Sequence, residues 1–268
     1  MKLTVAELGF AYKQAVVLKG VNLTATTGEC VCVLGANGAG KTTLFRCLLG
    51  LLEGYSGQIS FNDQDGAHLS ARSRAKLIAY VPQAHSPVFN YSVFDTVLMG
   101  RNVAAGPVLG PGPSQDQPVR DALEDVGIAQ LAERGFGELS GGERQLVLVA
   151  RALAQQAEMI VMDEPTANLD YGNQLRVLDR VRALARRGHL VLLSTHSPEH
   201  ALLFADRVIV LKDGLVAADG VPGDVLTASL IDQIYGVSVE VRTVTAAWGE
   251  VPVIVPRVSD SRSAIGRC

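Results

Sequence analysis

Fully apolar runs of four or five residues recur along the chain, and a segment with helical periodicity follows each of them. Such runs lie at Cys30–Leu34, Met159–Met162 and 190–193. They lack the polar alternation of a half-exposed strand, which is typical of strands buried on both faces of a parallel sheet. Strands that alternate with helices predict the α/β class with a parallel central sheet.

Two other regions alternate polar and apolar positions. From 3 to 26 the alternation predicts short strands, interrupted at Gly9 and at 19–20, that form an N-terminal antiparallel β layer. Beyond residue 237 it predicts a β-hairpin around Trp248 with a frayed end from residue 259. These regions add antiparallel structure at both ends of the α/β core.

Helical periodicity replaces strand patterning between 85 and 157. One helix is predicted at 93–100, and a second one from Pro118 to Gly127, because proline is favoured at the first helical position and glycine after the last one. The run 106–113 is rich in glycine and proline and predicts a loop. We therefore predict a core of 1–84 and 158–236, an inserted α-helical subdomain of 85–157, and a C-terminal hairpin and tail of 237–268.

The segment 35–42 reads G-x-x-x-x-G-K-T and joins the first apolar run to a helix. Glycines let the backbone turn its N–H groups inward, and the helix start adds positive potential, so this loop predicts a nucleotide phosphate site. Lys41 would reach the β- and γ-phosphates, and the Thr42 hydroxyl would bind Mg²⁺. The predicted ATP contacts from this segment are Gly35, Asn37, Gly38, Ala39, Gly40, Lys41, Thr42 and Thr43.

An acidic pair, Asp163 and Glu164, ends the second apolar run. Open α/β sheets bind ligands at the carboxyl ends of their strands. Asp163 would hold Mg²⁺ through water, and Glu164 would polarise an attacking water. His196 follows the next apolar strand and would contact the γ-phosphate. Alone, such a pair can be only a turn and such a histidine only structural, but the phosphate loop in the same chain favours function.

A further helix start is marked by Ser140 and Glu143, which have the spacing of a capping box. The alternative interpretation is an ordinary capped helix. The intervening Gly141 and Gly142 leave backbone amides free, however, and free amides at a helix start bind anions.

Composition excludes several other classes of protein. The net charge of −3 gives no sign of a nucleic-acid partner. Apolar runs stay far below the ~20 residues of a membrane span, and 1–10 does not resemble a charged-then-apolar leader. We therefore expect a cytoplasmic protein. If it serves a membrane process, other chains must supply the membrane part. The four cysteines form no C-x-x-C pair and are expected to be buried, reduced thiols.

Together these motifs resemble the nucleotide-binding subunit of ATP-binding cassette (ABC) transporters over 3–236. The resemblance implies a P-loop NTPase (RecA-like) core with the antiparallel layer and the helical insertion. Segment 35–42 matches Walker A, 161–164 the end of Walker B, 139–145 the signature, and 167–170 the D-loop. Gln83 matches the Q-loop, His196 the switch histidine, and Tyr12 the aromatic residue that stacks on adenine. Glu143 stands where the family signature usually has glutamine.

The family resemblance also implies a mechanism. Two copies would face head to tail as a homodimer, with each ATP between Walker A of one copy and the signature of the other. It implies Glu164, His196 and Gln83 as catalytic residues and Thr42, Gln83 and Asp163 as Mg²⁺ ligands. Further ATP contacts would come from Tyr12, Ser140, Gly141, Gly142, Asp163 and Asp170. Two transmembrane permease subunits would dock on 84–101 at the inner face of the cell membrane, and a substrate-binding protein would act indirectly.

Finer similarity narrows the substrate. Segments 80–87, 97–101, 167–174 and 195–201 look like those of importers of iron–siderophore, haem and cobalamin chelates. Alternatives are another ABC importer or exporter, a non-transport ABC ATPase, and a nucleotide-dependent scaffold without turnover. Non-transport members usually carry a coiled coil or two cassettes, which this chain lacks, and Glu164 and His196 argue against a scaffold.

Overall fold

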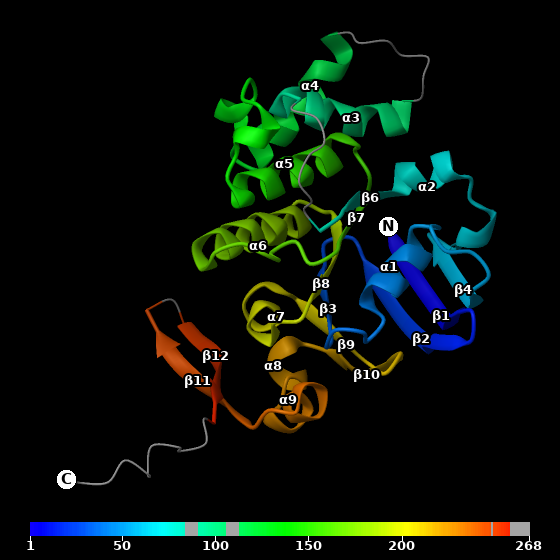
Figure 1. Cartoon of the computed structure of the whole chain (residues 1–268), viewed down its shortest axis with the longest axis vertical. Helices are drawn as coiled ribbons and strands as arrows, with labels where there is room; N and C mark the ends of the chain where they lie inside the picture. Colours follow the sequence, from blue (N-terminus) through cyan, green and yellow to red (C-terminus); the bar gives the residue numbers. More distant parts are fainter. Residues whose placement is uncertain (84–90, 106–112, 248, 258–268) are drawn as a thin grey trace.

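The computed structural model describes residues 1–83, 91–105, 113–247 and 249–257 (Figure 1). A six-stranded sheet with the order β10-β9-β3-β8-β7-β6 lies at its centre. Neighbouring strands from β9 to β6 are parallel, and β10 pairs antiparallel to β9. The bounds are β3 Cys30–Leu34, β6 Ile78–Val81, β7 Met159–Met162, β8 Leu190–Thr195, β9 Arg207–Lys212 and β10 Leu215–Gly220. The predicted α/β fold with a buried parallel sheet is confirmed.

The N-terminal antiparallel layer is also present, as a second sheet with the order β2-β1-β4-β5. It comprises β1 Lys2–Tyr12, β2 Ala15–Thr26, β4 Ser56–Phe61 and β5 Gln64–Asp65. The predicted interruptions at Gly9 and 19–20 are wrong, because both long strands continue through these positions. Register shifts near Gly9, and a left-handed φ of 88° at Gly20, absorb the glycines as local irregularities.

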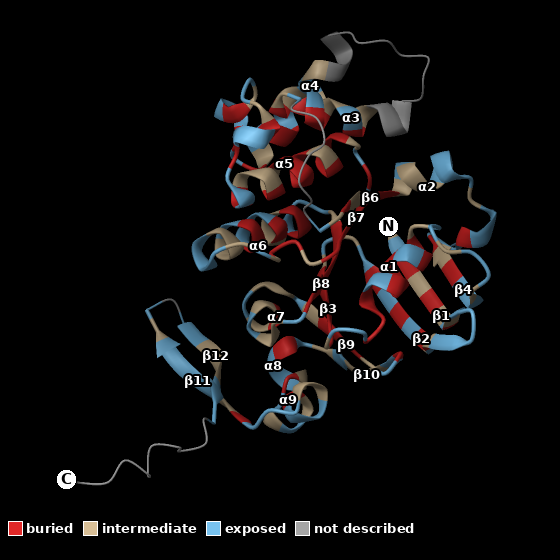
Figure 2. Cartoon of the chain, viewed as in Figure 1, coloured by how far each residue is buried: buried red, intermediate tan, exposed pale blue. Residues whose placement is uncertain are grey.

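Two hydrophobic clusters cover the two faces of the central sheet. Val31 and Val33 of β3 contribute to the cluster shared with the antiparallel layer and the first helix. Cys30 and Cys32 contribute to the cluster shared with the helical insertion, which also includes Val97. Figure 2 shows buried residues concentrated along the central strands and the sides of the helices that face them. The insertion therefore shares its core with the sheet, and the predicted domain boundaries stay predictions.

Nine α-helices occur among the described residues. They are α1 Lys41–Leu48, α2 Ala71–Leu77, α3 Val93–Ala105, α4 Pro113–Asp125, α5 Gly141–Ala154, α6 Tyr171–Arg186, α7 Pro198–Phe204, α8 Pro222–Val225 and α9 Ala228–Tyr235. Single 3₁₀ turns lie at Gly66–His68, Ala129–Leu131 and Phe136–Glu138. The first α3 residue is as predicted, but the helix continues to Ala105.

The predicted start of α4 is wrong. Pro113 takes the first helical position, and Pro118 lies in the second turn, inside the helix. Either proline could begin the helix by its propensity for the first helical position, and in the structure Pro113 does so. Gly127, with φ 75°, follows the end of the helix as predicted. The rest of the predicted loop, 106–112, lies outside the described residues.

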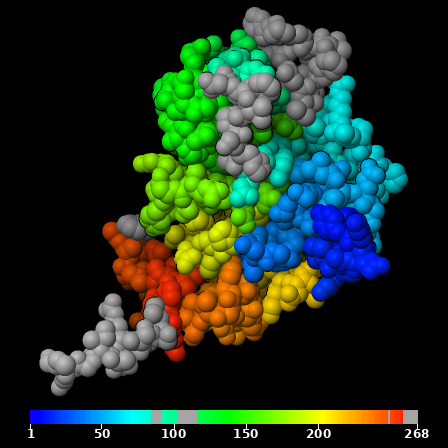
Figure 3. All heavy atoms as spheres, viewed as in Figure 1, coloured from blue at the N-terminus to red at the C-terminus, as the bar shows by residue number. Residues whose placement is uncertain are grey.

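The C-terminal hairpin is confirmed. Strands β11 Val239–Ala246 and β12 Gly249–Pro256 pair antiparallel and contact α9 and α7 respectively. Figure 3 places this hairpin on the side of the molecule opposite the N-terminal strands. Trp248, the tail from 258 and Cys268 lie outside the described residues. The other three cysteines are buried and free of disulfides, as expected. No described helix is both long enough and apolar enough to cross a bilayer.

Candidate functional site

The predicted phosphate loop connects the buried strand β3 to α1. Gly35 packs so closely against β9 that an added Cβ would lie 2.4 Å from the carbonyl oxygen of Leu211. Gly40 has a φ of 107°, which disfavours any residue with a side chain, and it is the N-cap of α1. Asn37 and Gly38 are exposed, whereas Gly40 and Thr43 are buried. The glycines thus serve close backbone packing and a tight turn into the helix.

Lys41 lies beneath this loop with only 6% of its surface exposed. Its Nζ donates hydrogen bonds to the carbonyl oxygens of Gly35 at 2.7 Å and Ala36 at 3.1 Å. Burial lowers the pKa of Lys41, and the carboxylates of Glu164 and Asp163 oppose that shift. No acidic residue occupies the first turn of α1, so the positive end of the helix is not neutralised there. The ammonium of Lys41 and the positive end of α1 therefore favour binding of an anion at this loop.

Glu164, which follows β7, lies close to Lys41, which follows β3, and to His196, which follows β8. Its Oε1 lies 3.8 Å from Lys41 Nζ and 3.5 Å from Nδ1 of His196. The backbone of Glu164 is left-handed, with a φ of 47°, a costly conformation for a residue with a side chain. Its carboxylate is 20% exposed, and the His196 ring is 58% exposed. The carboxylate therefore lies between a buried ammonium and an accessible imidazole, where an ordered water could give up a proton.

A residue that the sequence analysis did not assign supports the acidic pair from below. The fully buried Ser194 of β8 donates a hydrogen bond from Oγ to Asp163 Oδ1 at 2.7 Å. The same oxygen accepts one from the backbone N–H of Glu164 at 2.9 Å. One hydroxyl thus orients both acidic residues. The sequence signal that could have identified Ser194 is its place directly after 190–193, the next fully apolar run after Met159–Met162.

The described residues offer oxygen ligands for Mg²⁺ but no complete set of protein ligands. Thr42 and Gln83 are exposed, whereas the Asp163 side chain is buried. Among the described residues, no three His, Cys, Asp or Glu side chains cluster as metal ligands. Mg²⁺ is commonly held by one or two protein oxygens together with substrate phosphates and waters. The donor set fits an ion that arrives with a nucleotide.

The predicted signature forms the start of α5. Ser140 Oγ accepts a hydrogen bond from the Glu143 N–H, and the Glu143 carboxylate accepts one from the Ser140 N–H, which confirms the capping box. These hydrogen bonds lower the pKa of Glu143. Ser140 and Gly141 are exposed. The Ser140 N–H is already bound to Glu143, so the Ser140 hydroxyl and the Gly141 amide are the groups here that an anion could reach.

The signature packs against the predicted D-loop. An added Cβ on Gly142 would lie 2.6 Å from the side chain of Asn173, and one on Gly141 would lie 3.2 Å from Leu169. Asp170 caps α6 through the N–H of Asn173 at 2.8 Å. Among the described residues, no hydrogen bond or ion pair joins Ser140, Gly141 or Gly142 to Lys41, Glu164 or His196, so the start of α5 makes no direct polar contact with these three residues within one copy.

Tyr12 ends strand β1 and is 40% exposed. Its ring meets Phe10 edge-on, with centroids 4.9 Å apart. Aromatic rings can bind flat ligands by offset stacking. The contact with adenine stays a prediction.

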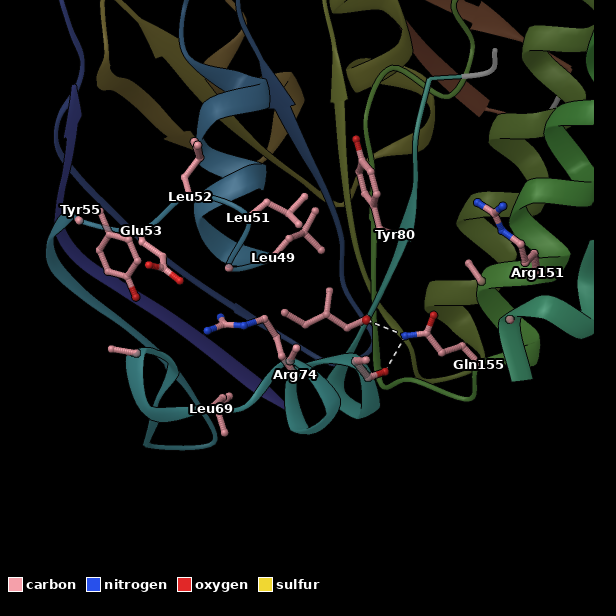
Figure 4. Close-up of a pocket in the computed structure, with 18 of the residues that line it drawn as sticks. Leu49, Leu51, Leu52, Glu53, Tyr55, Leu69, Arg74, Tyr80, Arg151 and Gln155 are labelled. Carbon is pink, nitrogen blue, oxygen red and sulfur yellow. Dashed lines mark hydrogen bonds between the residues drawn. The ribbon is translucent and has the colours of Figure 1, made fainter. Parts of the chain in front are cut away.

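A groove that the sequence analysis did not foresee lies between the core and the helical insertion (Figure 4). It has a volume of about 960 Å³. Its walls come from the C-terminal ends of α1 and α5, from α2, and from Tyr80, Met99 and Gly100. Figure 4 shows leucines of the segment after α1 on one side and Arg151 and Gln155 of α5 on the other.

Known proteins are similar to this chain in sequence and in architecture. A family model described as ABC transporter matches residues 18–167. The hemin import ATP-binding protein HmuV of Bordetella pertussis is 41% identical over 250 residues, which cover 90% of this chain and 94% of the relative. A probable iron chelatin transport ATP-binding protein of Helicobacter pylori is 32% identical over 257 residues, or 95% and 99% of the two chains.

Solved structures of ABC proteins are similar to this chain as well. A metal-chelate type ABC transporter in an inward-facing conformation has a TM-score of 0.85 and 32% identity, over 96% of this chain and 97% of that chain. A nucleotide-free ATP-binding cassette has a TM-score of 0.80 and 26% identity, over 88% and 99%. The family match covers more than half of the chain. The predicted loop precedes α1, the acidic pair follows β7, and the predicted signature forms the capped start of α5. The chain therefore belongs to the ABC transporter family, in which it is an ATP-hydrolysing cassette.

Proposed function

We propose that this cassette energises uptake of a metal chelate, such as haem, an iron–siderophore or cobalamin. The observation that carries the proposal is the similarity, over nine-tenths of the chain, to the hemin import protein at 41% identity. The similarity to a metal-chelate type transporter over nearly the full chain supports the same class of cargo. Selection of the cargo belongs to other subunits.

The residues around Lys41 form the half of the ATP site contributed by one copy. Lys41 and the loop amides bind the β- and γ-phosphates, and Tyr12 supports the adenine ring. Glu164 orients and deprotonates the attacking water, and His196 contacts the γ-phosphate. Thr42, Gln83 and, through water, Asp163 would hold Mg²⁺. When bound, the ion neutralises charge that develops on the phosphates.

A second copy supplies the other half. Ser140, with the exposed amides at the start of α5, contacts the γ-phosphate across a head-to-tail homodimer, and Asp170 lies at the same interface. The lack of a direct polar contact, among the described residues, between the start of α5 and Lys41 within one copy supports this arrangement, since a capped helix start with free amides otherwise lacks an anion. ATP then holds the dimer closed, and hydrolysis releases it.

Two permease subunits dock on the groove beside the helical insertion, so the cassette works at the inner face of the cell membrane. The predicted docking segment 84–101 includes Met99 and Gly100, which line the groove. Its first part, 84–90, lies outside the described residues. A substrate-binding protein acts on the far side of the membrane and contacts only the permease.

Uptake measurements test the proposal. Cells that lack this chain should lose accumulation of one labelled compound among haem, ferric siderophores and cobalamin, and the intact chain should restore it. The matched control is the Glu164→Gln variant, which should fold and bind ATP but restore nothing. Normal uptake of all three classes in cells without the chain would contradict the proposed cargo and leave the ATPase assignment standing.

A further inference from the structure

The groove of Figure 4 lies at the far ends of the two helices that begin at the ATP-binding motifs. Helix α1 starts at Lys41 and ends at the groove residues Leu49 and Gly50. Helix α5 starts after Ser140, and Arg151, Ala152 and the C-cap Gln155 at its other end line the groove. At a rise of 1.5 Å per residue, the helices span about 12 Å and about 21 Å. Both nucleotide-contacting helix starts therefore have a rigid connection to one groove.

Gln155 joins the end of α5 to the core across the base of this groove. Its Nε2 donates hydrogen bonds to the carbonyl oxygens of Ala75 at 2.5 Å and Ile78 at 2.8 Å. Ala75 lies in the last turn of α2, where carbonyl groups lack a partner within the helix. Figure 4 shows both hydrogen bonds converging on this one amide. The Gln155 side chain thus links the end of the signature helix by hydrogen bonds to α2 and to the start of β6.

Arg74 continues the connection from α2 to α1. Its guanidinium donates hydrogen bonds to the carbonyl oxygens of Leu48 at 3.0 Å and Gly66 at 2.5 Å. Gly50 packs directly on the guanidinium, since an added Cβ would lie 2.6 Å from Nε. The sequence of contacts is therefore α5, Gln155, α2, Arg74 and α1. Each polar contact ends on a backbone carbonyl, so each one positions a whole element and not merely a side chain.

The neighbouring glutamine makes a different contact. Gln156 accepts a hydrogen bond from Arg101 of α3 at 2.5 Å, which stays inside the helical insertion. Helices α3 and α5 already pack closely, because an added Cβ on Gly100 would lie 2.1 Å from the carbonyl oxygen of Arg151. Gln155 therefore crosses between the insertion and the core, and Gln156 does not.

We propose that Gln155 is a positioning residue that makes the ATP-binding end of α5 and the groove move together. A displacement of the signature helix when ATP binds pulls α2 through the Gln155 amide, and Arg74 passes that displacement to the C-terminal end of α1. The width of the groove then reports the nucleotide state. The partner that reads this width is the permease of the proposed function, on which this last step rests.

The test measures groove width in the chain alone. Spin labels replace two groove residues that are both exposed, Leu51 of the core and Met99 of the insertion, in a Cys268→Ser background. Pulsed electron resonance gives their separation with and without Mg²⁺–ATP, in the Glu164→Gln background to prevent turnover. We expect ATP to shift this separation. In Gln155→Met, which keeps the volume but removes the donor, the shift should be lost while ATP affinity is unchanged.

Control variants separate positioning from a structural role. Gln156→Gly removes the neighbouring side chain without strain at its φ of 60°, and it should keep the shift. Gln155→Lys keeps a donor for the two carbonyls and should restore the shift, whereas Gln155→Glu should not. If Gln155→Met does not fold, the comparison of the ATP-dependent shift in Gln155→Lys with that in Gln155→Glu tests the proposal in its place. A merely structural glutamine would lower the melting temperature and leave the shift intact.

Two results would overturn the inference: an ATP-dependent shift in Gln155→Met equal to that of the parent, or no shift in the parent. Neither result bears on cargo, because the uptake experiment does not depend on groove width. Conversely, failure of the uptake experiment would leave the link between the groove and the ATP site intact. The two proposals therefore fail separately.

Discussion

Lys41 Nζ lies 3.8 Å from Glu164 Oε1, and the buried ammonium has its other contacts only to loop carbonyls among the described residues. The proposed general base is thus also the counter-ion of the proposed phosphate ligand. A γ-phosphate entering the loop would compete with Glu164 for Lys41 and free the carboxylate to act on water. Binding and activation of the base are therefore linked through one lysine.

Glu164→Gln should keep ATP binding and nearly abolish turnover. The amide keeps the shape of the side chain but cannot accept the proton of the attacking water, and loss of a general base typically costs about 10²- to 10⁴-fold in rate. Steady-state phosphate release measures the loss, and size-exclusion chromatography with ATP should show a trapped dimer. Undiminished hydrolysis would remove Glu164 from its proposed role.

Ser140→Arg should abolish hydrolysis while each monomer still binds ATP. A bulky cation at the start of α5 blocks the surface on which the second copy's nucleotide would sit, but Lys41 and its loop are unaffected. Binding of a fluorescent ATP analogue and ATPase activity separate the two effects.

The matched control is Ser140→Ala, which removes the same helix cap at a typical cost of about 1 kcal/mol without adding bulk. It should keep substantially more activity than Ser140→Arg. Wild-type activity in Ser140→Arg would mean that the signature of one copy does not meet the ATP of the other.

Ser194→Ala should weaken Mg²⁺-dependent activity and stability together. Without the hydroxyl, Asp163 loses a fixed orientation and the partly buried Glu164 N–H loses its acceptor. An unsatisfied buried donor costs about 1–3 kcal/mol, and loss of a residue that orients a metal ligand costs about 10-fold or more in metal affinity. Denaturant unfolding and a Mg²⁺ titration of ATPase activity measure the two effects.

Ser194→Cys provides the comparison, because it fills the space with a weaker hydrogen-bonding group. Its Mg²⁺ dependence should lie between those of the parent and Ser194→Ala. An unchanged Mg²⁺ titration in Ser194→Ala would show that Asp163 needs no support from β8.

Glu143→Gln should remove a pH-dependent part of the stability. Hydrogen bonds from Ser140 hold the pKa of Glu143 below its ordinary 4.5, so its stabilising contribution is complete above that pH and is lost as the pH falls through the lowered value. Glutamine forms the same capping box without titrating.

Unfolding free energies of parent and variant, compared from neutral pH down to acid, check this expectation. The difference between the two proteins should change in favour of glutamine below about pH 4.5, by about 1 kcal/mol or less, because the carboxylate is only partly shielded from solvent. A difference that is constant with pH would mean that the Glu143 carboxylate contributes nothing to the cap.

Local signals account for what the sequence predicted well. The phosphate loop, the acidic pair after β7 and the capping box of α5 are each defined by residues within one turn or one strand end, so their spacing is visible in the chain itself. Local signals failed where contacts with other parts of the chain determine the start of a helix or the continuity of a strand. Proline propensity could not choose between Pro113 and Pro118 as the start of α4, and glycine content could not tell a break at Gly9 from an irregular but continuous strand.

By itself, the sequence determined the class of fold and the place of the predicted phosphate loop between β3 and α1, because apolar period and glycine spacing follow directly from backbone geometry. Only the tertiary structure decided that Lys41, Glu164 and His196 meet, that Ser194 supports Asp163, and that Gln155 crosses to α2. Strands that are apolar on both faces carry no pattern that fixes their order or register in a parallel sheet. The order β3-β8-β7, which brings these strand ends side by side, emerges from packing of the whole chain.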